Sequence, residues 1–343
     1  MKNNPFTPWG MPKAIMDRKT EQKLIINFLS QVASGSSWFL LIIGGIGTGK
    51  TTLLRFAKQE AEKEKLPVCF LKIHKNSDRK ELIKNLKVEI NRIVREFEEN
   101  GNIEKNAAES FISAKSADLD WIIKMAKKLL KTGLVIIISQ MDNCKKPQSV
   151  IDEMASIAER EKEVGFIVSS TKRLRPPLGC MLTELKAIEE QDFREYIEKM
   201  TKSEEGMPKV GEECARVLYQ ESGGNPRLLQ FLLWYLYENA HEGEQIITKA
   251  HYISSKKAIL SMLANEWFGA LYADASPAEK SVLKQLALSG EATVTEIARA
   301  IKKNEGPTAT LLLRLLERGD VIKVKRGAYK LFAPLYASFI AEM

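Results

Sequence analysis

The chain has 343 residues, of which 44% are hydrophobic and 28% charged, so we expect two or three folded domains with a sizeable core. No apolar run approaches the roughly 18–20 residues of a membrane span, and the N-terminal residues carry no secretory signal, which predicts a cytoplasmic protein without a membrane partner. The net charge of +8 is compatible with nucleic-acid contact but does not require it, because Lys and Glu are interleaved.

Four short aliphatic runs in the first half of the chain are expected to be buried strands. They alternate with charged helical patterns, which predicts a parallel sheet covered by helices on both faces. The runs are residues 38–43, 67–73, 134–139 and 164–170. Between the second and third runs, residues 78–131 have a mostly helical period, with a loop or a break between helices at 99–110.

The sequence GGIGTGKTT follows the first of these runs and precedes a helical pattern. It matches G-x-x-x-x-G-K-[ST], whose glycines allow backbone N–H groups to surround phosphates at a helix N-terminus. Lys50 is expected to reach the β- and γ-phosphates, and the Thr51 hydroxyl is a candidate Mg²⁺ ligand. The predicted residues for binding ATP or ADP in this loop are Gly44, Gly45, Ile46, Gly47, Thr48, Gly49, Lys50, Thr51 and Thr52.

The third run, LVIIISQMDN, is the candidate for the strand that lies beside the phosphates and presents an acid to the metal. With this strand and the phosphate loop, the chain resembles the AAA+ superfamily, in particular its archaeal, signal-transduction (STAND) and origin-recognition-like ATPases. The family's strand ends in Asp-Glu-x-Asp. Here the metal-side Asp is replaced by Ser139 and the water-activating Glu by Gln140, while the last Asp is retained as Asp142.

These replacements predict slow ATP hydrolysis with retained binding. Ser139 can hydrogen-bond a metal-bound water but brings no charge, so Mg²⁺ affinity should fall. Gln140 has the shape of Glu but cannot accept a proton, which removes general-base help worth about 10²–10⁴ in rate. The alternative is that another acid, such as Asp142, reaches the metal.

The resemblance extends to weaker motifs on either side of this strand. Upstream, Arg18 and Glu21 match a segment that lies near the adenine in the family, although Asp17 stands where Gly is usual. After the fourth run, Ser170 or Thr171 stands where the family senses the γ-phosphate. The arginines that follow are candidates to contact a neighbouring subunit's nucleotide, or are part of a solvated basic loop: Arg173 and Arg175.

Residues 182–268 show no strand pattern and are expected to form a helical lid. Within them, ESGGNPRLLQFLL resembles the family's Gly-Asn-Pro-Arg lid motif. Gly223 and Gly224 end one helix, Pro226 suits the first turn of the next, and Arg227 is placed to reach a phosphate. A plain helix start with an exposed Arg is the alternative.

The last part of the chain predicts a winged helix, with three helices and a hairpin that turns at Gly327. The first helix has the capping signature of Ser276, Pro277 and Glu279, and NEG is the expected turn before the third. That third helix is heavily apolar, so the module either binds duplex DNA or packs against the core or a partner protein. The candidate DNA contacts are Thr308, Thr310, Arg314, Arg318, Lys323, Lys325 and Arg326.

Together these patterns predict an α/β P-loop core in residues 1–181, a helical lid in 182–269 and a winged helix in 270–343. We expect an ATP-binding AAA+/STAND-like switch protein, with ATP or ADP and Mg²⁺ as ligands, whose nucleotide state sets the arrangement of the lid and winged helix or drives self-association. The alternative is an initiator or recruiter that binds duplex DNA. Ser139 and Gln140 argue against an ordinary ATPase motor.

Overall fold

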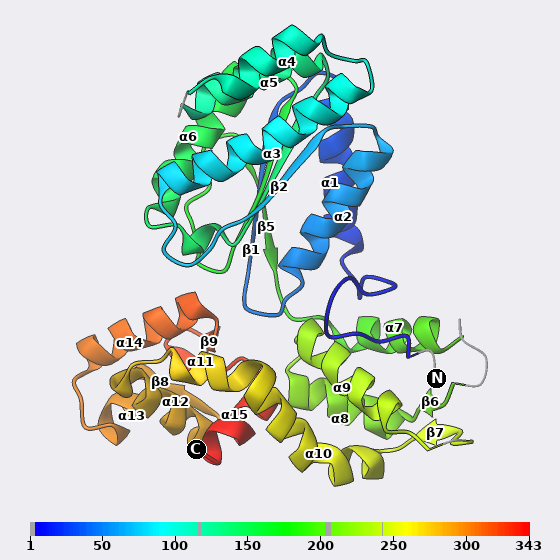
Figure 1. Ribbon diagram of the computed structural model, residues 1–343. Coiled ribbons are helices and arrows are strands. Elements are labelled where there is room, and N and C mark those ends of the chain that lie inside the picture. Colours follow the sequence, from blue (N-terminus) through cyan, green and yellow to red (C-terminus); the bar gives the residue numbers. More distant parts are fainter. Residues whose placement is uncertain (1–3, 116–117, 203–206, 242) are drawn as a thin grey trace. The chain divides into compact units, whose positions relative to one another are not determined.

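The computed structural model describes residues 4–115, 118–202, 207–241 and 243–343 (Figure 1). They form two compact units. The sheet unit consists of residues 18–44 and 50–185, and the helical unit consists of the described residues of 4–17, 45–49 and 186–343. The tip of the phosphate loop, residues 45–49, therefore makes its contacts within the helical unit.

The sheet unit contains a five-stranded sheet in the order β2-β3-β4-β1-β5, with every neighbouring pair parallel. The four expected strands are confirmed, with ends that differ by no more than one residue. The fifth strand contradicts the expectation that residues 182–268 contain no strand. This strand leaves no continuous aliphatic run in the sequence, because it lies at the edge of the sheet and only its last residue is buried. The strands are β1 (Trp38–Gly44), β2 (Val68–Lys72), β3 (Leu134–Ser139), β4 (Val164–Ser170) and β5 (Met181–Leu185).

Helices cover both faces of this sheet, as the aliphatic runs predict (Figure 1). Leu40 and Ile42 of β1 point to one face and Leu41 to the other, so each face has a core of its own. The helices of the first face are α1 (Lys19–Ala33) and α2 (Lys50–Lys63), and those of the second are α3 (Arg79–Glu99), α4 (Lys105–Ser113), α5 (Leu119–Leu130) and α6 (Pro147–Arg160). The break expected at residues 99–110 is shorter than predicted and covers residues 100–104, because α4 begins at Lys105.

The described residues of 186–273 in the helical unit are mainly helical, but they also contain two short strands that pair in parallel. Strands of two residues are too short to leave a sequence pattern, so they too were missed. A π-helical segment, labelled η2, joins the last two helices of this region. The elements are α7 (Glu190–Lys202), β6 (Lys209–Val210), α8 (Glu212–Ser222), α9 (Pro226–Glu238), β7 (Ile246–Ile247), α10 (Lys249–Leu263), η2 (Ala264–Phe268) and α11 (Gly269–Ala273).

The C-terminal residues form helices around a small antiparallel sheet. The expected hairpin is confirmed, with Gly327 at a φ of 78° in its turn, and a third strand pairs with it. The Ser276–Glu279 capping box is also present. The expected turn NEG is wrong in part, because the third helix already begins at Glu305. The elements are α12 (Pro277–Ser289), β8 (Glu291–Thr293), α13 (Val294–Ala300), α14 (Glu305–Arg318), β9 (Val321–Lys325), β10 (Ala328–Leu331) and α15 (Pro334–Ala341).

The helices α7 to α11 and the C-terminal elements share one hydrophobic core within the helical unit. Their contact is close at Gly223, where a Cβ atom would lie 2.6 Å from the carbonyl oxygen of Phe332. Because only glycine fits so near a backbone oxygen, α8 ends directly against the residues that lead into α15. In the part of the chain that the structure describes, no helix has the length and apolarity to cross a membrane.

Candidate functional site

The phosphate-loop motif occupies the connection between β1 and α2, as its sequence context predicts. Gly47 and Gly49 have φ values of 79° and 98°, in the left-handed region that favours glycine. The Thr48 hydroxyl donates a 2.9 Å hydrogen bond to the Gly45 carbonyl oxygen and tightens the turn. A loop of this kind, ending at a helix N-terminus, has the geometry that binds phosphate through backbone N–H groups.

Lys50 opens α2 and carries the positive charge of the loop. Its Nζ atom donates a 2.6 Å hydrogen bond to the Gly44 carbonyl oxygen. Burial lowers the pKa of Lys50 to about 8, while the negative charge of Asp142 opposes this shift. Thr51 is exposed and Thr52 half-buried in the first turn of the same helix, so the Thr51 hydroxyl is open to solvent.

The polar residues that end β3 and β4 lie at the same edge of the sheet, because the two strands pair in parallel. Ser139 and Ser170 are both buried, and the Ser170 hydroxyl donates a 2.8 Å hydrogen bond to the Lys172 carbonyl oxygen. Ser170 pairs with Ile43, directly before the phosphate loop. The structure thus brings Ser139 and Ser170 to adjacent strand ends, with β4 between β3 and β1.

Asp142 holds the segment that leaves β4. Its Oδ1 atom accepts a 2.8 Å hydrogen bond from the backbone N–H of Thr171. Gln140 adopts a left-handed conformation with φ 63°, and its backbone N–H donates to the Ser169 hydroxyl at 3.3 Å. Asn143 Nδ2 donates to the carbonyl oxygen of Ile73 at 3.0 Å and further braces this turn. The three residues therefore have defined structural partners at the end of β3.

Arg18 is a buried residue at the start of α1. It takes a left-handed φ of 71°, and its guanidinium lies 3.6 Å from the Glu21 carboxylate. The preceding Asp17 also has a positive φ, 56°, which gives a physical reason for the glycine that the resemblance expects there. Arg173 and Arg175 are exposed on the loop that follows β4.

In the helical unit, the start of α9 is bonded to the tip of the phosphate loop. Asn225 is the N-cap of α9, and its side chain accepts hydrogen bonds from the N–H groups of Arg227 and Leu228. Its Nδ2 atom donates a 2.8 Å hydrogen bond to the Ile46 carbonyl oxygen. The Arg227 N–H also donates to the Gly47 carbonyl oxygen at 3.2 Å. Sequence reasoning named Arg227 but missed the role of Asn225 as cap and donor.

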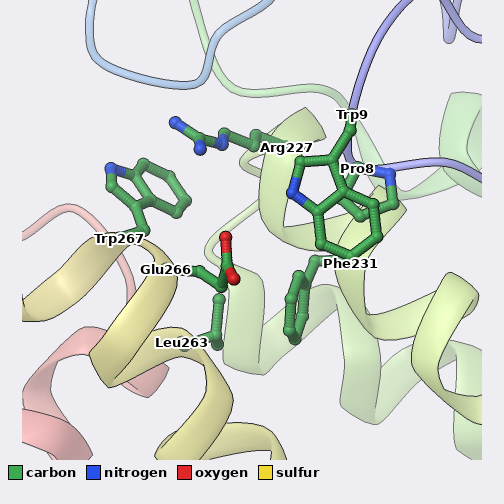
Figure 2. Close-up of a pocket in the computed structure, with 7 residues that line it drawn as sticks. All are labelled: Pro8, Trp9, Arg227, Phe231, Leu263, Glu266 and Trp267. Atoms are coloured by element: carbon green, nitrogen blue, oxygen red, sulfur yellow. The ribbon is translucent and has the colours of Figure 1, made fainter.

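The side chain of Arg227 borders a pocket within the helical unit (Figure 2). Its guanidinium carbon lies 4.3 Å from the centroid of the Trp267 ring. Partial burial lowers the pKa of Arg227, and the negative charge of Glu266 opposes the shift. No sequence pattern pointed to this pocket, because three separate segments form it. The lining residues are Pro8, Trp9, Arg227, Phe231, Leu263, Glu266 and Trp267.

The candidate DNA contacts on α14 and the β9–β10 hairpin are only partly exposed. The expectation that Thr308 is exposed is wrong: it is fully buried, and its hydroxyl donates a 2.9 Å hydrogen bond to the Asn304 carbonyl oxygen. Arg318 is largely buried and lies 3.0 Å from Asp320. The remaining candidates are exposed: Thr310, Arg314, Lys323, Lys325 and Arg326.

A family model described as nephrocystin 3, N-terminal, matches residues 21–171. A comparison with curated proteins gives no match. Among solved structures, Cdc6p from Pyrobaculum aerophilum is similar over 100% of this chain and 98% of its own, with 14% identity and a TM-score of 0.55. Drosophila ORC bound to DNA is similar over 97% of this chain and 88% of its own, with 15% identity and a TM-score of 0.50.

A STAND protein with a tetratricopeptide repeat sensor from Pyrococcus horikoshii is also similar, with 18% identity and a TM-score of 0.45. The similarity covers 97% of this chain and 43% of that protein. The matches to Cdc6p and ORC show that this chain has the fold of P-loop AAA+ ATPases. The predicted α/β fold class is therefore confirmed. The description of the C-terminal region as a winged helix stays a prediction.

Proposed function

We propose that this chain is an ATP-binding switch protein of the AAA+/STAND type that hydrolyses ATP slowly. The observation that carries the proposal is the phosphate loop, in which Gly47 and Gly49 take the left-handed conformation and Lys50 opens the following helix. Backbone N–H groups at that helix terminus and the Lys50 charge supply the interactions that bind the phosphates of ATP or ADP.

The oxygen donors near the loop suit a nucleotide-bound Mg²⁺ ion, which prefers hard ligands and keeps several waters. Thr51 offers an exposed hydroxyl in the first turn of α2, and Ser139 offers a buried one at the end of β3. Within the described residues, no group of three His, Cys, Asp or Glu side chains gathers as a metal site. An ion there would depend on these hydroxyls, on phosphate oxygens and on water, which favours weak Mg²⁺ binding.

The proposal of slow hydrolysis rests on the residues that end β3. Gln140 cannot take a proton from an attacking water, and Ser139 adds no charge at the metal. Asp142 is engaged with the Thr171 N–H, and this hydrogen bond supports a structural role for its carboxylate rather than a catalytic one. Proton abstraction would then have no carboxylate in the usual place, and turnover should be slow.

The proposed switch acts through the lid. Hydrogen bonds join Asn225 and Arg227 to carbonyl oxygens of the phosphate loop. A movement of the loop would therefore move the start of α9. In this proposal the chain consists of a core in residues 1–181, a lid in 182–269 and a winged helix in 270–343, it works in the cytoplasm, and nucleotide state changes self-association or the binding of a partner protein.

Binding and hydrolysis can be tested separately. We expect the purified protein to bind ATP and ADP, and Lys50→Ala to abolish both. We expect slow phosphate release by the parent chain and faster release by the double variant Ser139→Asp/Gln140→Glu, which restores the two acids. Absence of nucleotide binding by the parent chain would exclude the proposed function. Rapid turnover by the parent chain would exclude the slow switch.

A second candidate function is duplex-DNA binding by the C-terminal region. The observation that favours it is the set of exposed cations on the β9–β10 hairpin, namely Lys323, Lys325 and Arg326. Ile322 and Val324 are exposed on the same strand, which favours a protein partner instead. Duplex binding that weakens with salt and is lost in a Lys323→Glu/Arg326→Glu variant would support DNA. No binding at low salt would exclude it.

A further inference from the structure

The residues that contact Arg227 are presented by a π-helical turn. The helical path continues from α10 through Ala264–Phe268 into α11, and the extra residue of a π turn changes the direction of the side chains around it. Gly269 follows this turn, and a Cβ atom there would strike the carbonyl oxygen of Ala264. The glycine therefore allows the turn that carries Glu266 and Trp267.

Trp267 is fixed by aromatic packing on its buried side. Only 6% of the residue is exposed, and its ring centroid lies 5.5 Å from that of Phe268 and 5.7 Å from that of Phe332. Phe332 follows β10, so a residue of the C-terminal region helps to set the orientation of the indole. A ring held in this way offers a fixed face to a cation.

The same ring also lies beside the tip of the phosphate loop. A Cβ atom at Gly47 would come within 3.0 Å of Trp267 Cη2, which shows how closely the indole approaches the loop backbone. The Arg227 guanidinium lies over the indole at 4.3 Å. Figure 2 shows the Glu266 carboxylate directed into the same pocket, beside Trp267 and below Arg227.

We infer that Trp267 is a positioning residue that holds the Arg227 guanidinium beside the phosphate loop, ready to contact the terminal phosphate of ATP. The inference rests on the proposed function and adds a residue that makes binding selective for ATP over ADP. A long Arg side chain loses considerable rotamer freedom when it is ordered. The indole face restricts that freedom before nucleotide arrives, so less entropy is lost on binding.

The inference predicts a selective effect on ATP. ADP lacks the terminal phosphate, so its affinity should not depend on the placement of Arg227. In a Trp267→Leu variant, which keeps an apolar side chain but removes the π face, we expect ATP affinity to fall about tenfold, the size of a partly desolvated cation–π contact. ADP affinity should stay as in the parent chain. Trp267→Phe keeps an aromatic face and should recover most of the loss.

The experiment measures dissociation constants for ATP and ADP with the full chain, by calorimetry, for the parent and for Trp267→Leu, Trp267→Phe and Glu266→Gln. Glu266→Gln removes a charge from an exposed residue and is a milder test if Trp267→Leu does not fold. Because the Glu266 carboxylate attracts the Arg227 guanidinium, loss of its charge should lower the ratio of ATP affinity to ADP affinity severalfold. Trp121→Leu, on α5 in the sheet unit, is the matched control and should change neither constant.

A double-variant measurement on Arg227 and Trp267 distinguishes a positioning role of Trp267 from a general loss of structure. In an Arg227→Ala background, Trp267→Leu should have no further effect on the ratio of the two affinities, because the group that it positions is gone. Equal losses for ATP and ADP, or effects that add in the double variant, would overturn the inference and leave the proposed function standing. A parent chain that binds neither nucleotide would overturn both.

Discussion

The side-chain amide of Asn225 joins the first turn of α9 to the phosphate loop. Its Nδ2 atom donates a 2.8 Å hydrogen bond to the carbonyl oxygen of Ile46, while its Oδ1 atom accepts from the N–H groups of Arg227 and Leu228. One buried residue thus caps a helix and holds the loop that is proposed to bind phosphate. The two roles use different atoms, so substitutions can separate them.

Replacing Asn225 should therefore affect stability and nucleotide binding differently. Asn225→Ser keeps a capping oxygen but removes the donor to the Ile46 carbonyl without adding a charge, so we expect near-parent thermal stability and weaker nucleotide binding. Asn225→Ala removes both roles and should also lower the free energy of unfolding by about 1 kcal/mol. Thermal unfolding and nucleotide titration of both variants test this. Equal nucleotide affinity in the parent and Asn225→Ser would show that the hydrogen bond to Ile46 does not contribute to nucleotide binding.

Gly319 offers a test of how the C-terminal region contacts the loop. It ends α14 with φ 83°, and a Cβ atom there would lie 3.0 Å from the Ile46 backbone nitrogen. Gly319→Asn suits a left-handed residue but adds a side chain against the loop, so we expect nucleotide affinity to fall. Gly327→Asn is the matched control, because its φ is 78° and nothing lies within 4 Å of an added Cβ. Similar affinities in the two variants would contradict the prediction.

The sequence was sufficient for features that depend on local pattern. Buried parallel strands need continuous aliphatic runs, so Leu134–Ser139 and Val164–Ser170 were predicted with their observed ends. The capping box of Ser276 and Glu279 is likewise a short-range signal. The phosphate loop combines both, because its glycines stand between a strand and a helix.

The features that sequence reasoning missed depend on tertiary packing. Trp9, Arg227 and Trp267 line one pocket although they are far apart in the chain, and no periodicity marks the π turn at Ala264–Phe268. Thr308 was expected on the surface as a polar residue. It instead lies one helical turn before the buried Leu312, and its hydroxyl is satisfied by the Asn304 carbonyl, which allows it to be buried.

Asp320 should make stability depend on pH. It is fully buried beside Arg318, Tyr336 and Glu279, and burial raises its pKa from 3.8 to about 6. Because the folded-state pKa lies above the unfolded value, the contribution of Asp320 to the free energy of unfolding is fully present below pH 4 and is lost as pH rises through 6. A shift of about two units corresponds to about 3 kcal/mol.

The contribution of Asp320 can be isolated by difference. Asp320→Asn cannot titrate, so the parent chain should lose stability relative to this variant between pH 4 and pH 7, as measured by urea unfolding. Glu317→Gln, at an exposed residue on α14, serves as the control and should follow the parent across this range. A constant difference between the parent and Asp320→Asn would refute the assignment.

Substitution of Asp142, the acid that is retained after β3, tests whether its carboxylate acts as the general base in ATP hydrolysis. Its Oδ1 atom accepts the Thr171 N–H at 2.8 Å, and an Asn side chain at this position can accept the same hydrogen bond. If Asp142 is structural, Asp142→Asn should keep both nucleotide affinity and slow phosphate release, whereas Asp142→Ala should destabilise the end of β4 by about 1 kcal/mol. If Asp142 is a general base, Asp142→Asn should lower turnover by about 10²–10⁴ because the amide cannot take a proton. Single-turnover phosphate release by the parent and both variants distinguishes these outcomes, and we expect the parent and Asp142→Asn to have the same slow rate.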